Sequence, residues 1–259
     1  MSLLVVENLR KAFGGVHAVD GVDFAVDAGE AVAMIGPNGA GKTTCFNLLG
    51  GQLRPDGGRI LLADENVAGL APHAIWRRGL ARTFQVAATF RSMSARENVQ
   101  VALLSQRKRT LDLWRPARSQ LAAEAEALLA RVGLAERAAQ PVTALPYGDL
   151  KRLELAMALA NAPRLLLLDE PTAGIAAGER MALMDLISAI VRSEGIGVLF
   201  TEHDMDVVFG HGERVIVLHE GRVAAEGPPE AIRADAKVRE IYLGTADEDP
   251  PRPAPLLPC

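Results

Sequence analysis

The sequence is poor in cysteine and contains no long hydrophobic run, and both absences exclude whole classes of protein. Its two cysteines, Cys45 and Cys259, cannot build a disulfide framework, so the composition fits the reducing cytosol. No apolar run approaches the roughly 20 residues that a transmembrane helix needs. The first residues also lack the basic region and the long apolar segment of a signal peptide. We therefore expect a cytosolic chain that does not itself span a membrane.

An excess of basic charge is absent as well. The 259 residues include 28 Lys and Arg against 32 Asp and Glu, which gives a net charge of −4 and an isoelectric point near 5.8. Nucleic-acid-binding proteins are usually basic, so this balance argues against that class. The sequence shows no internal repeat, and its length suits one large domain or two small ones.

The most informative segment is Gly36–Thr44, with the sequence GPNGAGKTT, directly after the apolar run Ala31–Ile35. Glycines at this spacing let successive backbone N–H groups turn inward and bind phosphate, and the helix expected after them adds its positive N-terminal end. The side chain of Lys42 can reach the β- and γ-phosphates, and the Thr43 hydroxyl can ligate Mg²⁺. The alternative is a glycine-rich turn with an unrelated lysine. We predict a nucleotide site at Asn38, Gly39, Gly41, Lys42, Thr43 and Thr44.

Apolar runs without polar alternation predict a mainly parallel sheet that is buried on both faces. Such runs are residues 31–35, 164–168, 196–200 and 215–218, and Gly221 permits a hairpin into Arg222–Ala224. Residues 4–6 and 22–26 are predicted to form N-terminal strands with one buried face, an antiparallel part. Residues of about 88–160 show helical periodicity and form the predicted helical subdomain, whereas the charged, proline-rich residues 245–259 are expected to be disordered.

Polar residues follow two of the predicted parallel strands. Asp169 and Glu170 come after Leu165–Leu168, where a carboxylate points into the ligand crevice of such a sheet. Asp169 could bind Mg²⁺ beside Thr43, and Glu170 could orient and deprotonate the attacking water. His203 follows the next strand and could contact the γ-phosphate. The alternatives are a pair of solvated acids and an ordinary histidine.

Three further residues carry weaker signals. Gln85, at the start of the helical segment, could ligate the metal or position water. Gly148 precedes an amphipathic helix and could offer a second anion contact, with helix capping by Asp149 as the alternative. Phe13 precedes the flexible pair Gly14-Gly15 and could stack on adenine, or it could be a core residue. Cys45, just inside the helix after the phosphate loop, is interpreted as a small packing residue.

In this order, the elements resemble the ATP-binding subunits of ABC transporters over residues 3–244. The resemblance implies a P-loop ATPase core within residues 1–244. Phe13 matches the family's adenine-stacking aromatic, Gly36–Thr44 its Walker A loop and Gln85 its Q-loop glutamine. ATP and Mg²⁺ are the implied substrate and cofactor.

The second half of the sequence resembles the family even more specifically. From Leu145 to Pro171 the family pattern aligns without a gap. Leu145–Arg152 occupies the position of the signature motif, and Gly148 is implied to contact the ATP of a partner subunit. Asp169 and Glu170 match the end of Walker B, and His203 matches the switch histidine.

Four stretches resemble the subgroup of branched-chain amino acid transport ATP-binding proteins. They are residues 13–20, 81–85, 145–149 and 241–244. The resemblance implies a second, related ATPase subunit, transmembrane permease subunits, a periplasmic solute-binding protein and a peripheral location on the cytoplasmic face of the inner membrane. Importers of urea and aromatic acids share the subgroup, so the solute stays open.

Three positions depart from the broad family pattern. Pro146 replaces the signature serine, Asp149 replaces its glutamine, and Ala176 stands where the loop after Walker B usually has aspartate. The resemblance implies that all three positions affect what this chain contributes to the ATP site of its partner. The departures therefore predict two unequal ATP sites if the partner is a different subunit with a regular signature.

Two rival classes fit less well. A soluble clamp ATPase of DNA repair or translation usually carries a long coiled coil or two cassettes, and the sequence has neither. A P-loop GTPase needs Asn or Thr followed by Lys-x-Asp, and none of the five lysines stands in that motif.

Overall fold

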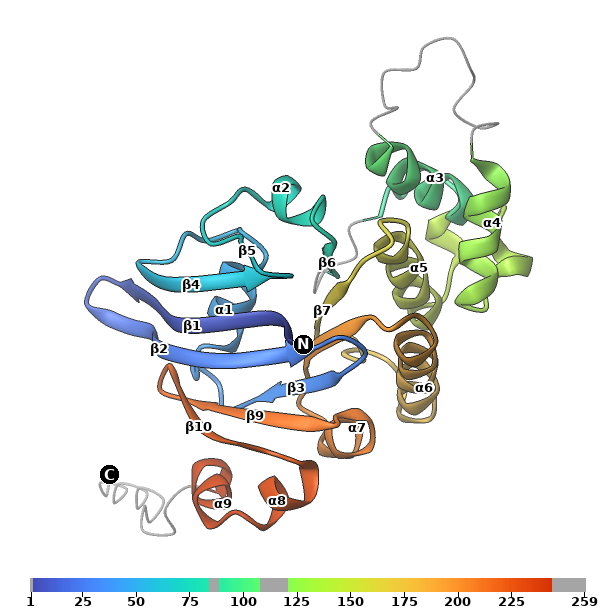
Figure 1. Ribbon diagram of the computed structural model, residues 1–259. Helices are drawn as coiled ribbons and strands as arrows, with labels where there is room; N and C mark the ends of the chain where they lie inside the picture. Colours follow the sequence, from blue (N-terminus) through green and yellow to red (C-terminus); the bar gives the residue numbers. More distant parts are fainter. Residues whose placement is uncertain (1, 84–88, 108–120, 244–259) are drawn as a thin grey trace, which may run out of the picture.

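The computed structural model describes residues 2–83, 89–107 and 121–243, and these form two β-sheets with helices around them (Figure 1). The first sheet is antiparallel, with four strands in the order β2-β1-β4-β5. Its members are β1 (Ser2–Phe13), β2 (Val16–Asp27), β4 (Gly57–Leu62) and β5 (Glu65–Asn66). The predicted N-terminal strands are therefore confirmed but were too short, because polar residues on the exposed face continue each strand beyond its apolar centre.

The second sheet has six strands in the order β10-β9-β3-β8-β7-β6 and is parallel except for one hairpin. The strands are β3 (Ala31–Ile35), β6 (Leu80–Arg82), β7 (Leu165–Asp169), β8 (Gly197–Thr201), β9 (Arg214–His219) and β10 (Arg222–Gly227). Every residue of β3, β7 and β8 is buried, as the continuous apolar runs predict. Glu220 and Gly221, both at positive φ, form the predicted turn between β9 and β10.

Alternate residues of the central strands belong to two different hydrophobic clusters. Met34, Leu167 and Leu199 pack with the antiparallel sheet and with α1 (Lys42–Leu49). Their neighbours Ala33, Leu168 and Phe200 pack with the helices on the other face. Each central strand therefore contributes to both clusters, because its side chains alternate between the two faces of the sheet. This arrangement confirms the predicted α/β fold with a mainly parallel sheet.

Helices make up the regular structure between residues 89 and 160, as far as the structure describes that segment. They are α3 (Ala95–Gln106), α4 (Ala122–Arg131) and α5 (Tyr147–Leu159), with single 3-10 turns at Ala135–Arg137 and Val142–Ala144. Figure 1 shows α3 and α4 on the side of the molecule away from β1, β2 and β4. The side chain of Ser94 and that of Glu97 cap α3 reciprocally, which fixes where this helix begins.

The remaining helices connect or follow the strands. They are α2 (Pro72–Trp76), α6 (Ala177–Glu194), α7 (Met205–His211), α8 (Pro229–Ala234) and α9 (Ala236–Leu243). Within the described ranges, no helix is both long enough and apolar enough to cross a membrane. The predicted tail, residues 245–259, lies outside the described residues.

Candidate nucleotide-binding site

The phosphate loop joins the C-terminal end of β3 to the N-terminus of α1, as predicted. Two of its glycines have no possible replacement. Gly36 and Gly41 have φ angles of 154° and 104°, and a Cβ atom on either would lie 2.2 Å from the carbonyl oxygen of Leu218 or 2.4 Å from that of Ala18. The loop therefore keeps its shape only with glycine at both positions.

The loop presents backbone donors that the protein itself does not use. The N–H groups of Gly39, Gly41, Lys42, Thr43 and Thr44 bond to no acceptor among the described residues, and no side chain caps α1. Gly39 and Thr43 are exposed. Unpaired N–H groups at the start of a helix form an anion site, and the helix dipole adds to its positive potential.

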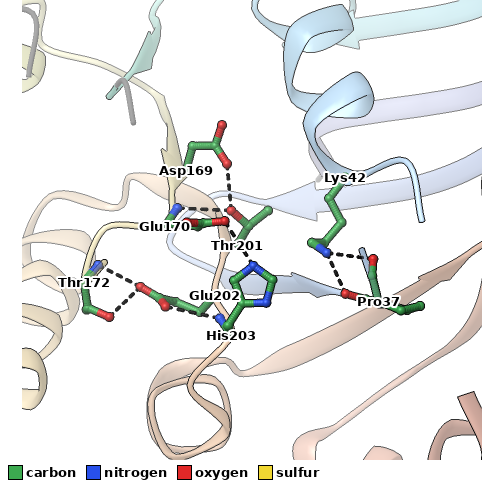
Figure 2. A network of polar contacts seen from close by, with 9 residues as sticks. Pro37, Lys42, Asp169, Glu170, Thr172, Thr201, Glu202 and His203 are labelled. Atoms are coloured by element: carbon green, nitrogen blue, oxygen red, sulfur yellow. Dashed lines mark hydrogen bonds and ion pairs between the residues drawn. The ribbon is translucent and has the colours of Figure 1, made fainter. Parts of the chain in front are cut away.

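Lys42 adds the positive charge of a side chain to this site. Its ammonium group donates to the carbonyl oxygen of Gly36 at 2.5 Å and to that of Pro37 at 3.1 Å (Figure 2). Burial lowers the pKa of Lys42, and the nearby carboxylates of Glu170 and Asp169 oppose that shift. The lysine and the two acids therefore share one electrostatic environment, although β3 and β7 are not neighbours in the sheet.

Asp169 is held from both sides at the end of β7. One carboxylate oxygen accepts a hydrogen bond of 2.9 Å from the Thr201 hydroxyl, which lies at the end of the adjacent β8. The other oxygen forms an ion pair of 2.9 Å with Arg82, the last residue of β6. Neither partner was predicted from the sequence. Arg82 ends a strand of only three residues, which is too short for a periodic signal.

Glu170 and His203 were predicted in separate roles, and the structure places them in contact. The imidazole Nε2 of His203 lies 3.0 Å from a carboxylate oxygen of Glu170 (Figure 2). The backbone of Glu170 has a positive φ of 49° and donates to the carbonyl and the hydroxyl of Thr201. Two strand ends thus position the acid and the histidine together.

The buried carboxylate of Glu202, which was not predicted from the sequence, links the segments that follow β7 and β8. Glu202 accepts hydrogen bonds of 2.7 Å from both the backbone N–H and the hydroxyl of Thr172, and a longer one of 3.3 Å from the backbone N–H of His203 (Figure 2). Only 5% of its surface is exposed. Its place directly after β8 was the signal that could have found it, because the same argument selected His203.

The predicted residues outside this cluster have different outcomes. Phe13 is 47% exposed at the end of β1, with the Lys11 ammonium 5.5 Å from its ring centre, so the alternative of a core residue is wrong. Gln85 lies outside the described residues, and its role stays a prediction. Cys45 is fully buried, and burial raises its pKa to about 12, as suits a packing residue.

The residues at the signature position, 145–152, include the start of helix α5. Pro146 precedes the first helical residue, and no side chain caps this helix. The alternative of a cap by Asp149 is wrong, because this carboxylate pairs with Arg137 instead. The backbone N–H groups of Tyr147 and Gly148 have no acceptor in the described part of the chain, so this helix start also offers donors.

The side chains near the phosphate loop suit Mg²⁺ by their chemistry. The ion prefers oxygen ligands and is usually held by one or two protein groups together with substrate phosphates. The Thr43 hydroxyl at the start of α1 and the Asp169 carboxylate are groups of this kind. In the described ranges, no group of three or more His, Cys, Asp or Glu side chains could hold a metal ion.

Comparison with known proteins identifies the family. The family model for ABC transporters matches residues 19–173, more than half of the chain. The chain is 41% identical to the high-affinity branched-chain amino acid transport ATP-binding protein LivG of Escherichia coli K12, over 94% of this chain and 98% of LivG. The chain belongs to the ABC transporter family. The resemblance found in its sequence motifs is thereby confirmed.

Further members of the ABC transporter family point to the same subgroup. BraF of Pseudomonas aeruginosa, named as a high-affinity branched-chain amino acid transport ATP-binding protein, is 40% identical over 94% of this chain and 98% of its own length. A second model, for branched-chain amino acid ATP-binding cassette transporters, matches residues 222–248. The ADP conformation of MJ1267, an ATP-binding cassette of an ABC transporter, superposes with a TM-score of 0.85 at 30% identity, covering 95% of this chain and all of that one.

Proposed function

We propose that this chain is the ATP-binding and ATP-hydrolysing subunit of an ABC importer for branched-chain amino acids. One observation carries the proposal. Backbone N–H groups that have no acceptor among the described residues lie at the start of α1 together with the Lys42 side chain, whose pKa is affected by the charges of Glu170 and Asp169. The identity to LivG and BraF over nearly the whole chain supports the transport role and the class of solute.

In this proposal each side chain has one task toward ATP. The exposed ring of Phe13 stacks on adenine, and the residues Asn38–Thr44 bind the phosphates through their N–H groups and the Lys42 charge. Glu170 accepts the proton of the attacking water, and His203 contacts the γ-phosphate. Gln85 keeps its predicted role at the γ-phosphate and the metal. Catalysis is then positioning together with neutralisation of charge that builds up on the phosphoryl group.

Thr43, Asp169 and Gln85 would hold Mg²⁺, which neutralises phosphate charge when bound. Other residues of the chain hold the proposed ligands and their neighbours in place. Thr201 and Arg82 fix the Asp169 carboxylate, and Glu202 fixes the backbone that carries His203. The contact between Glu170 and His203 keeps the proposed base beside the proposed phosphate ligand.

Transport requires partners, and the proposal names them by class. A second ABC ATPase subunit would cover the phosphate loop with its signature motif, while Gly148 of this chain serves the partner's ATP. Transmembrane permease subunits would bind beside the helices of residues 88–160, and a periplasmic binding protein would deliver the solute. The chain would then sit peripherally on the cytoplasmic face of the inner membrane.

Reconstitution of the complete transporter in proteoliposomes tests the proposal. With the permeases, the partner ATPase and the binding protein present, we expect leucine uptake that requires ATP inside the vesicles. Lys42→Ala should abolish uptake and hydrolysis at this chain's site, because a lost contact of this kind removes about 3 kcal/mol of transition-state stabilisation. Lys237→Ala is the matched control, since the ammonium group of that lysine makes, among the described residues, only a long contact of 3.4 Å to the carbonyl of Ala224.

The outcomes separate the parts of the proposal. Retained hydrolysis in Lys42→Ala would refute the site. ATP-dependent uptake of urea or an aromatic acid in place of leucine would refute the solute but keep the transport role. A chain that hydrolyses ATP and never associates with the permeases would refute the transport role and favour a soluble clamp ATPase.

A further inference from the structure

We propose that Arg82 is a positioning residue, which holds the Asp169 carboxylate in the orientation that binds the divalent cation. The inference rests on the proposed function, since it takes Asp169 as the metal-binding acid. It starts from an ion pair whose members are both nearly removed from solvent. The side chains of Arg82 and Asp169 are 9% and 10% exposed, and the nitrogen and oxygen lie 2.9 Å apart.

Neighbouring groups fix the guanidinium independently of Asp169. Its Nη1 donates to the amide oxygen of Asn47 at 2.9 Å and to that of Gln52 at 3.1 Å. The guanidinium carbon also lies 5.8 Å from the ring centre of Phe46. These partners belong to α1 or to the turn directly after it. The helix that begins at the phosphate loop therefore also sets the place of Arg82.

The Nη2 group of Arg82 fixes the position of one Asp169 oxygen, and the Thr201 hydroxyl fixes the other. Arg82 ends β6 and Thr201 ends β8, and these two strands pair with β7 on either side. The carboxylate is thus held at both oxygens by donors from its two neighbouring strands. Each oxygen has two lone pairs, so one donor on each leaves acceptor capacity for a metal ion or its bound water.

The role differs from that of a structural ion pair. Removing Arg82 leaves a buried charge with a single hydroxyl partner, which lowers stability in any case. A positioning role adds a second effect, because a carboxylate that turns about its bond presents its free lone pairs in the wrong direction. Residues that orient metal ligands in this way typically contribute 10- to 100-fold to metal affinity. Metal affinity is therefore the property that distinguishes the two roles.

The experiment measures nucleotide and metal binding separately in the isolated full-length chain. ADP binding is titrated in EDTA, and Mn²⁺ binding to the ADP complex is followed by electron paramagnetic resonance. For Arg82→Gln we expect metal-free ADP affinity within about twofold of wild type and Mn²⁺ affinity reduced about tenfold or more. Arg82→Lys retains the charge but not the fork of donors, so it should recover only part of the loss.

Two further variants keep the test decisive. Arg214→Gln is the control, because Arg214 forms a comparable ion pair with Glu30, at 2.8 Å, away from the phosphate loop. It should lose stability without losing Mn²⁺ affinity. Gln52→Ala removes an exposed partner of Arg82 and leaves the ion pair in place, so it should fold and weaken Mn²⁺ binding by a smaller factor.

The possible results distinguish failure of the positioning role from failure of the proposed nucleotide site. Unchanged Mn²⁺ affinity in folded Arg82→Gln and in Gln52→Ala would overturn the positioning role and leave a structural ion pair. Tighter Mn²⁺ binding in Arg82→Gln would overturn it as well, because the arginine would then be a competitor of the metal. Failure of the wild-type chain to bind ADP and Mn²⁺ would instead refute the proposed nucleotide site.

Discussion

In the proposed function, the C-terminal edge of the six-stranded sheet (the sheet edge) would serve the chain's own nucleotide, and the N-terminal ends of α5 and α6 (the helix starts) would face a partner's nucleotide. These two regions are built in opposite ways. At the sheet edge, Asp169, Thr201 and Glu202 are buried. The Thr201 hydroxyl donates to Asp169, and Glu202 accepts from the backbone N–H of Thr172 in the segment after β7. At the helix starts, α5 follows Pro146 and α6 follows Ala176, and neither helix has a side-chain cap. Tyr147, beside the first of them, is 45% exposed.

This difference separates two kinds of requirement. In the proposed mechanism the sheet edge holds Asp169, Glu170 and His203 in fixed relative positions, and hydrogen bonds between the ends of neighbouring strands achieve this. Among the described residues, the start of α5 offers backbone donors at Tyr147 and Gly148 and no side-chain cap, and in the proposed function another subunit would supply the rest of that site. The comparison predicts that the two ATP sites of a heterodimer contribute unequally to turnover.

The largest expected effect comes from removing the proposed base at each site in turn. Glu170→Gln should keep ATP binding and reduce hydrolysis at this chain's site by about 100-fold or more, because the amide preserves size but cannot accept the proton. The corresponding change in a partner with a regular signature should cost less total activity, since in the proposed function that site would rely on Pro146 and Ala176. Single-turnover assays of both variant heterodimers measure the two losses.

Two results would contradict the inequality. Equal losses from the two substitutions would show that the helix starts of this chain serve the partner's ATP as well as a regular signature does. An active transporter assembled with only this chain as ATPase would contradict it too. A Glu170→Gln variant that fails to bind ATP would instead remove Glu170 from the role of base.

Restoring the missing hydroxyl should make the turnover rates of the two ATP sites more nearly equal. Pro146→Ser adds a side-chain donor for phosphate, and a hydrogen bond to a charged group contributes roughly 1.5–3 kcal/mol. We expect about a tenfold or greater rise in turnover at the partner's site and no change at this chain's own site. Each rate is measured with the other site inactivated, by Glu170→Gln in this chain or by the corresponding change in the partner. Unchanged turnover would mean that the hydroxyl is not what limits the site.

Phe13 tests the proposed adenine contact of the chain's own nucleotide site. Phe13→Ala should weaken ATP binding by about 1–2 kcal/mol through lost stacking. The melting temperature should change little, because Phe13 is already 47% exposed and belongs to neither hydrophobic cluster of the described residues. Titration with ATP and a thermal melt of the same preparation separate the two properties. Normal ATP affinity in the variant would remove Phe13 from the site.

The sequence predicted those parts of the fold in which local pattern and tertiary packing agree. The continuous apolar runs of β3, β7 and β8 lie where both faces of the sheet are covered, so hydrophobicity alone locates them. The strand β6 escaped prediction because its three residues are too few for any period. The outer parts of β1 and β2 escaped because polar, exposed residues form them, and only pairing with a neighbouring strand makes them extended.

The site was predictable where a motif ties residue type to chain position. Gly36–Thr44, Asp169 and His203 follow strands, and each strand end lies at the same edge of the sheet. Arg82 and Thr201 were not predictable in this way, because the contacts that make them important join residues far apart in sequence, whereas Glu202 directly follows β8 and could have been found as His203 was. The pairing of Arg82 with Asp169 spans 87 positions and arises only when β6 and β7 become neighbours.

The smallest expected effect returns to the second helix start. Ala176 occupies the position before α6 in an extended conformation, with φ of −61° and ψ of 143°, and Glu179 stands three residues later. Ala176→Asp would place an acceptor beside the first unpaired N–H groups of the helix, in a spacing that also permits a capping box with Glu179. We expect about 0.5–1 kcal/mol of added stability, measured by urea unfolding, with ATP affinity at the chain's own site unchanged. Ala176→Gly is the control without an acceptor. If adding Ala176→Asp to Pro146→Ser raises turnover at the partner's site beyond Pro146→Ser alone, the departures at the two helix starts act together. If Ala176→Asp stabilises α6 and leaves turnover unchanged, Pro146 accounts for the unequal sites.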